Sequence, residues 1–145
     1  MLASVITVVS ALAASVVAVP DVQAREVLAS WPATNFQKAC TPGHCQAMFD
    51  ISAPAGYAKD APAFKVTCKA PQNQAYVKCE SASPLAKDSS VQSMFTDGAS
   101  KDAMKISVFH IWNEGATTFN ASGSVEVTPS ATGFTLPVTS LTGIA

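Results

Sequence analysis

The chain has few of the residues on which most enzymes and nucleic-acid-binding proteins depend. It contains two histidines, His44 and His110, and no G-x-S-x-G sequence that would hold a serine nucleophile. Its nine Lys and Arg residues are scattered, and ten Asp and Glu residues balance them. Such a chain lacks the field that gathers on polyanions, which excludes nucleic acid as a partner. We predict that the protein is not an enzyme and has no catalytic residues, no cofactor and no metal site.

Charge is absent altogether from the first part of the chain. No charged side chain precedes Asp21, and residues 2–19 form an apolar run, rich in Ala, Val and Ser, that could just span a bilayer. Small residues stand at the −3 and −1 positions of two signal-peptidase sites, after Ala18 and after Ala24. We therefore predict a signal peptide over residues 1–18, with cleavage after Ala24 as the alternative, rather than a membrane anchor. The mature protein is expected to be secreted and extracellular, with no membrane span.

The mature chain has the length of one domain. Residues 19–30 are expected to form an N-terminal extension, and residues 31–145 a single β domain. Alternation of apolar and polar residues, typical of half-buried strands, occurs at residues 46–52, 63–68, 74–79, 91–96, 103–112, 119–128 and 133–138. Clusters of Pro, Gly, Asn and Asp separate these runs. The pattern predicts an all-β fold, an antiparallel β-sandwich or β-barrel of about seven to eight short strands.

One run indicates a central strand. Residues 103–112 place an apolar set on one face, and Phe109 and Ile111 on the other face are also apolar. The set is Met104, Ile106, Val108, His110 and Trp112. In the following run, Gly123 is the candidate position for a β-bulge. Residues 84–92 are the one helical candidate, and they are too few to form a stable helix alone.

Four cysteines in an exported chain predict two disulfides, and three pairings are possible. Cys40 and Cys45 flank Pro42-Gly43, which suits the centre of a type II turn that would bring the two sulfur atoms together. Cys68 and Cys79 end two β-patterned runs, and a hairpin would place them side by side. We favour the pairs Cys40–Cys45 and Cys68–Cys79, worth about 2 and about 3 kcal/mol in the chain-entropy model.

Other uses of these polar residues are weaker hypotheses. Cys40 and Cys45, with His44 between them, could hold a metal ion, but the second ligand pair of a structural zinc site is missing. His44 is expected to be solvated in its turn, and a catalytic thiol would need a reducing compartment or a labile disulfide. Asp97 and Asp102 flank a turn, which is more typical of a solvated loop than of an acid–base pair.

Two further features concern the surface. Asn120-Ala-Ser is an N-glycosylation sequence, and the alternation points Asn120 outward, so we predict a glycan there. Trp31, Phe36 and Trp112 are candidates for an exposed aromatic platform, although aromatic residues in a domain of this size are more often core. His110 is expected to be a core histidine with satisfied hydrogen bonds, because it lies on the apolar face of its strand.

The cysteine motifs carry a resemblance to known secreted proteins. One motif resembles the opening of many small secreted proteins of filamentous fungi: Trp31-x4-Phe36-x3-Cys40-x4-Cys45-x3-Phe49-x-Ile51. Phe-Lys-Val-Thr-Cys68 and Tyr-Val-Lys-Cys79 resemble the cysteine-bridged hairpin in the family of the Alternaria major allergen. The resemblance covers roughly residues 31–128 and implies a secreted β-barrel. Some members of that family are elicitors that trigger hypersensitive cell death and defence in plants, and the family brings no agreed catalytic residues.

The resemblance gives the leading functional hypothesis. It implies a secreted fungal effector or elicitor that binds a host plant protein or cell-surface component and triggers or modulates defence. The alternative is a secreted binding module for a small apolar or phenolic ligand, and the third is a small secreted hydrolase or inhibitor. A monomer or a weak homo-oligomer is expected, because the chain has no further cysteine pair after Cys79 as the allergen pattern has.

Overall fold

The computed structural model describes residues 26–144 apart from 74, 87 and 101. The predicted signal peptide and both of its cleavage sites lie outside these residues. The described chain is all-β, which confirms the predicted fold class. Its strands are β2 (Ala29–Thr41), β3 (His44–Ala53), β4 (Phe64–Pro71), β5 (Val77–Lys78), β6 (Ser90–Asp97), β7 (Met104–Glu114), β8 (Thr117–Val127), β9 (Phe134–Val138) and β10 (Ser140–Ile144). Within the described ranges, no helix is long and apolar enough to cross a membrane.

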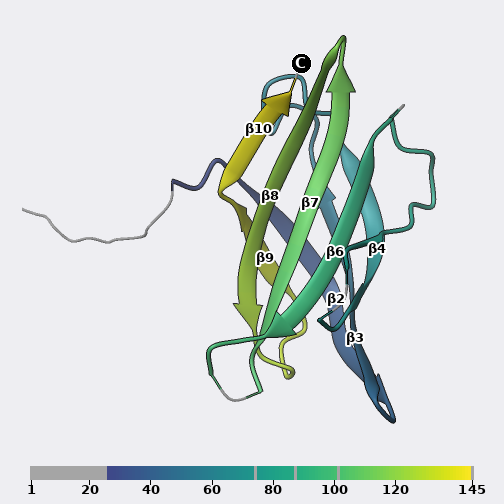
Figure 1. Ribbon diagram of the computed structural model, residues 1–145, viewed down its shortest axis with the longest axis vertical. Helices are drawn as coiled ribbons and strands as arrows, with labels where there is room; N and C mark the ends of the chain where they lie inside the picture. The colour runs from purple at the N-terminus through teal and green to yellow at the C-terminus, as the bar shows by residue number, and fades with distance from the viewer. Residues whose placement is uncertain (1–25, 74, 87, 101, 145) are drawn as a thin grey trace, which may run out of the picture.

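The strands form two antiparallel sheets that pack face to face. The front sheet has five strands in the order β10-β8-β7-β6-β5, and the back sheet has four in the order β4-β3-β2-β9. Figure 1 is viewed onto the front sheet, with the back sheet behind it. One hydrophobic core lies between the sheets, and Trp31, Phe49, Phe95 and Trp112 are among its largest side chains. Each sheet therefore has one face toward the core and one toward solvent.

Strand β7 follows the predicted alternation closely. Met104, Ile106, Val108, His110 and Trp112 are each at most 1% exposed, whereas the residues between them are exposed or half-buried. The strand pairs along its length with β6 on one side and β8 on the other, so it is central in the front sheet. The alternation of side chains thus predicted the buried face of β7 correctly. The apolar residues on its other face predicted its central position correctly.

Strand β2 was not among the runs that the alternation predicted, because its pattern of buried residues is interrupted. It contains an irregularity between Thr34 and Gln37, where Asn35 has a positive φ of 54°. This irregularity shifts the phase of the buried residues, so Trp31 and Ala33 face the core but so does Phe36. Of the described residues in the predicted run 74–79, Val77 and Lys78 form β5. The helical candidate, residues 84–92, is not helical in its described residues, and residues 90–92 belong to β6.

Gly123 is not the site of a bulge, because the register between β7 and β8 continues through it without a shift. Its backbone instead lies directly against β9. A Cβ atom added at Gly123 would meet the Pro137 carbonyl oxygen at 1.8 Å. The chain changes sheets at Thr139, between β9 in the back sheet and β10 in the front sheet. Gly123 therefore permits the close approach that joins the two sheets on this side.

Both favoured disulfides are present. Cys40 and Cys45 are register partners at the end of the β2–β3 hairpin, with Cα atoms 4.0 Å apart, and Gly43 has the positive φ of 79° that a type II turn requires. Cys68 and Cys79 have Cα atoms 4.4 Å apart. Their bond joins β4, at the edge of the back sheet, to the residue that follows β5 of the front sheet. It therefore helps to close the sandwich and does not merely fix a local hairpin.

Candidate functional site

The solvent-facing side of the front sheet is almost free of charge. Residues opposite one another in an antiparallel sheet lie on the same face, so the register defines the members of this surface. Its uncharged members are Ser90, Gln92, Met94 and Thr96 of β6, Ser107, Phe109, Ile111 and Asn113 of β7, Thr118, Asn120, Ser122 and Ser124 of β8, and Ser140, Thr142 and Ile144 of β10. We call this surface the neutral face.

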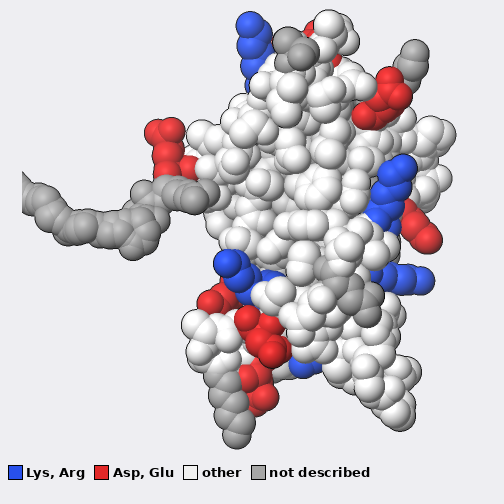
Figure 2. Space-filling view, viewed as in Figure 1, with Lys and Arg blue, Asp and Glu red and all other residues white. Residues whose placement is uncertain are grey.

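The charged side chains of the neutral face lie at its edges. Lys105 and Glu126 are register partners at one end of the sheet, and Lys78 of the edge strand β5 stands opposite Gln92. Figure 2, viewed onto the front sheet, shows the Lys, Arg, Asp and Glu residues around the margins of an uncoloured centre. Acidic and basic side chains both occur along this border, so the border attracts neither anions nor cations strongly.

An aromatic pair lies on the neutral face. The ring centroids of Tyr76 and Phe109 are 4.6 Å apart with an interplanar angle of 61°. Tyr76 precedes β5 and is 37% exposed, and Phe109 is half-buried in β7. In the register, Phe109 stands between Gln92 of β6 and Ser122 of β8. The pair is therefore an aromatic surface beside side chains that both donate and accept hydrogen bonds.

Sequence reasoning did not assign Tyr76 and Phe109 to a site, although it contained a signal for both. In their two runs, the predicted buried set consists of the alternate residues, so both aromatic rings are out of phase with it. The three aromatic residues that were candidates for a platform are instead core residues. Trp31, Phe36 and Trp112 are 0%, 6% and 1% exposed, which makes a role in surface stacking physically impossible in the folded chain.

Asn120 lies on the neutral face, and its side chain points outward as predicted. It stands opposite Ile111 of β7 and Thr142 of β10, and Ser122 of the same glycosylation sequence faces the same way. Asn120 is half-buried in β8, and Ala121 takes the buried position between it and Ser122. Glycosylation of Asn120 remains a prediction.

His110 is a core histidine with both ring nitrogens in hydrogen bonds. Its Nδ1 lies 2.6 Å from the Tyr57 hydroxyl and its Nε2 lies 2.9 Å from the Ser89 hydroxyl. The ring also contacts Phe64 and Trp112, with centroids 4.7 and 4.9 Å away. Burial lowers the pKa of His110 from 6.5 to about 4 and raises the pKa of Tyr57 above its ordinary value. The Ser89–His110 contact is thus enclosed by aromatic rings, where no substrate reaches the imidazole.

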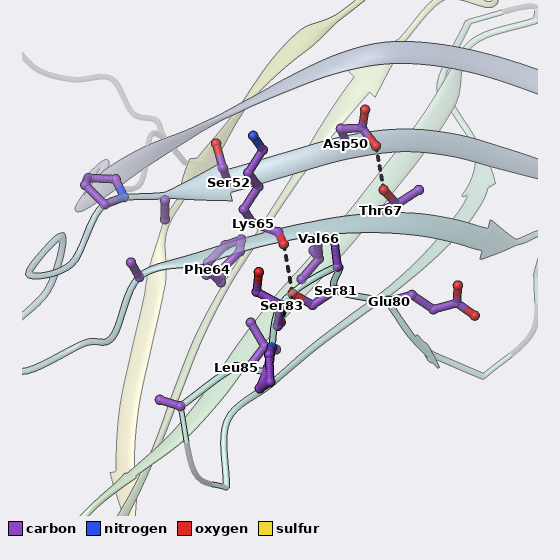
Figure 3. A pocket seen from close by; sticks show the side chains of 16 residues that line it. Asp50, Ser52, Phe64, Lys65, Val66, Thr67, Glu80, Ser81, Ser83 and Leu85 are labelled. Carbon is purple, nitrogen blue, oxygen red and sulfur yellow. Dashed lines mark hydrogen bonds between the residues drawn. The ribbon is translucent and has the colours of Figure 1, made fainter.

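A pocket of about 840 Å³ lies beside β4, between that strand and the segment that follows Cys79 (Figure 3). Phe64 and Leu85 contribute apolar surface, and Lys65 and Glu80 contribute charge. Asp50 also lines the pocket, and its carboxylate accepts hydrogen bonds from Asn35 Nδ2 at 2.8 Å and from the Thr67 hydroxyl at 2.7 Å. These two bonds, followed by the nearby Lys65 ammonium, lower the pKa of Asp50 below 3.8. A carboxylate held in this way is structural and poorly suited to proton transfer.

The remaining polar candidates do not assemble into a reactive centre. Asp97 and Asp102 share a second pocket of about 340 Å³ with Lys38, and the Asp97 carboxylate accepts a hydrogen bond from Gln72 at 3.1 Å. His44 is exposed at the start of β3, directly after the turn. Among residues 26–144, leaving aside the three that are not described, no group of three or more His, Cys, Asp or Glu could hold a metal ion.

Comparison of the chain with known protein families, curated proteins and solved structures finds no match. Of the surfaces and pockets above, the neutral face is the one that combines accessible aromatic rings, many hydrogen-bonding side chains and little charge.

Proposed function

We propose that the protein is an exported binding protein of the effector or elicitor type, which contacts a component of the host plant cell surface and modulates defence without catalysis. The observation that carries the proposal is the neutral face. Solvent-facing sides of antiparallel sheets are ordinarily polar, whereas this one holds the exposed Tyr76 ring against the half-buried Phe109 ring. Accessible aromatic rings within a surface depleted of charge are typical of recognition sites.

The two disulfides support an extracellular setting for this function. Disulfides form and persist in oxidising compartments, and they are dense in small secreted domains. Cys40–Cys45 fixes a hairpin end, and Cys68–Cys79 joins the edges of the two sheets. Both bonds constrain the fold directly, so neither needs a redox role to explain it. The resemblance of the cysteine motifs to fungal elicitors gives the proposed direction of action, toward a plant host.

The distribution of titratable groups supports binding in preference to chemistry. Enzyme sites bring groups with perturbed pKa values together in a cleft. Here the perturbed groups are separated by the fold: His110 and Tyr57 meet in the core, and Asp50 lies on the outer face of the back sheet with its hydrogen bonds satisfied. The proposed function therefore assigns no residue a catalytic role.

Infiltration of the purified protein into leaves tests the proposal. The protein is produced with its disulfides formed and applied at micromolar concentration to several plant species, with ion leakage and cell death as readouts. We expect a response that Phe109→Ser weakens and that Met48→Ser leaves unchanged, because Met48 is a half-buried apolar residue on the outer face of the back sheet. Absence of a response in every host would refute the effector function.

A further inference from the structure

We infer that the neutral face binds an uncharged polysaccharide chain, with Tyr76 and Phe109 packing against its sugar rings. The inference deepens the proposed function and rests on it, because it names the class of surface component that the protein contacts. It follows from three properties of the face: its lack of charge, its composition in hydrogen-bonding groups and the placement of the two rings.

The lack of charge selects against most other ligands. Anionic polysaccharides, phospholipid headgroups and nucleic acids are held by clusters of Lys and Arg. The neutral face has no such cluster in its described residues: Lys105 and Glu126 are paired at one end, and Lys78 stands opposite Gln92 on the edge strand β5. A neutral ligand loses no ion hydration on such a surface, whereas a charged one would be desolvated without a partner.

The abundance of serine distinguishes a glycan from a protein partner. The buried centres of protein–protein interfaces are enriched in aromatic residues and depleted in serine. The neutral face has the aromatic rings, but it also presents Ser90, Ser107, Ser122, Ser124 and Ser140. A serine hydroxyl donates one hydrogen bond and accepts others, and the amides of Gln92 and Asn120 also do both. Sugar hydroxyls have the same dual character, so each can bond to such a surface in either direction.

The geometry of the sheet places these groups in rows. The register aligns Gln92, Phe109, Ser122 and Ser140 across four adjacent strands. Neighbouring strands lie about 4.8 Å apart, a distance comparable with the length of one sugar ring. A chain laid across the strands therefore meets the hydrogen-bonding side chains of Gln92, Ser122 and Ser140, with the Phe109 ring between Gln92 and Ser122 and the Tyr76 ring beside it. Lys78, opposite Gln92, stands at the end of the row. The apolar faces of pyranose rings pack on aromatic rings in this arrangement.

Sedimentation with insoluble polysaccharides tests the inference. The chain is produced in the bacterial periplasm, where disulfides form and no glycan is attached to Asn120. It is mixed with chitin, cellulose and insoluble β-1,3-glucan, and with calcium pectate as the anionic comparison. We expect sedimentation with at least one neutral polymer and none with pectate. A soluble hexasaccharide of the polymer that binds is then titrated calorimetrically against each variant.

Matched variants identify the surface. We expect Phe109→Ser to weaken hexasaccharide binding by about tenfold or more, as truncation of a central aromatic contact does. Ser122→Lys introduces a charge beside Phe109 without removing packing, so it should weaken binding equally even where Phe109→Ser disturbs folding. Met48→Ser, on the back sheet, should have no effect. Circular dichroism and thermal melting confirm that each variant is folded.

The binding assay and the leaf assay together distinguish the glycan inference from the effector function. Failure to bind any neutral polymer, equal binding to pectate, or binding that neither Phe109→Ser nor Ser122→Lys weakens would overturn the glycan inference. A leaf response without polysaccharide binding would leave the effector function standing and refute the glycan as its contact. Polysaccharide binding that depends on Phe109, without any leaf response, would support the inference and refute the effector function.

Discussion

Acid should weaken this fold through His110. The imidazole is fully buried, and its nearest neighbours are aromatic rings and the hydroxyls of Tyr57 and Ser89. None of these groups carries a negative charge in acid that could compensate a protonated ring. Protonation in the folded state therefore places an unpaired charge in the core, which the unfolded chain avoids by hydrating it.

The size of the effect follows from the pKa of His110. Burial lowers it from 6.5 to about 4, so between these pH values the unfolded chain binds a proton that the folded chain does not. The stability conferred by the neutral ring is complete above pH 6.5 and is lost as the pH falls toward about 4. The free energy of unfolding falls by about 1.4 kcal/mol for each pH unit in this interval, about 3 kcal/mol in all.

Urea unfolding between pH 4 and 7 measures this loss, with tryptophan fluorescence as the probe because Trp31 and Trp112 are both buried. We expect the wild type to lose about 3 kcal/mol across this range and His110→Gln to lose little, since glutamine does not titrate. His44→Gln is the matched control, because His44 is exposed and its removal should leave the dependence intact. An equal loss in His110→Gln would refute the reasoning. Asp50 does not interfere, because its contribution disappears only below 3.8.

Three further predictions concern the disulfide between the two sheets, the close contact at Gly123 and the glycosylation sequence at Asn120. The double variant Cys68→Ser/Cys79→Ser should lower the free energy of unfolding by about 3 kcal/mol in urea titrations, from the loop that this disulfide closes. Gly123→Ala should destabilise the protein by about 3 kcal/mol or more in the same assay, because its Cβ would lie 1.8 Å from the Pro137 carbonyl oxygen. Secretion from a eukaryotic host should add a glycan to Asn120, seen as a mass that an endoglycosidase removes and that Asn120→Gln lacks. An unchanged urea midpoint in either of the first two variants, or a mass without added sugar in the third, would contradict the corresponding argument.

The strands that the sequence predicts well are those whose pattern is local. In β7 the alternation from Met104 to Trp112 needs no knowledge of the neighbours, because one face is buried throughout. The disulfide pairs were also predictable, since few residues separate the members of each pair. Strand β10 gave no such signal: Ser140–Ile144 has no buried residue, and it is a strand because β8 offers it a hydrogen-bonding edge. That edge depends on topology, which a local pattern does not encode.

The candidate site was less predictable for a related reason. Tyr76 and Phe109 are visible in the sequence as rings out of phase with their buried neighbours, but 33 positions separate them and β6 lies between their strands. Their contact depends on the pairing of β5 with β6 and of β6 with β7, both of which are long-range in the fold. The direction of the Cys68–Cys79 bond, from one sheet to the other, depends on the same pairing. Sequence identified the groups, and only the sheet order showed that they meet.

The position of these two rings argues that the neutral face has a use. The core already holds the large aromatic residues Trp31, Trp112, Phe49 and Phe95, so it does not lack apolar side chains. A Tyr and a Phe on a surface with little charge favour association between copies and contribute less stability than the same rings would in the core. A glycan on Asn120, which lies on β8 opposite Ile111 and two residues from the Phe109–Ser122 pair, would cover part of this face. If the face binds polysaccharide, the glycosylated protein should therefore bind it more weakly than the same protein after endoglycosidase treatment, and equal binding by both forms would place the site elsewhere.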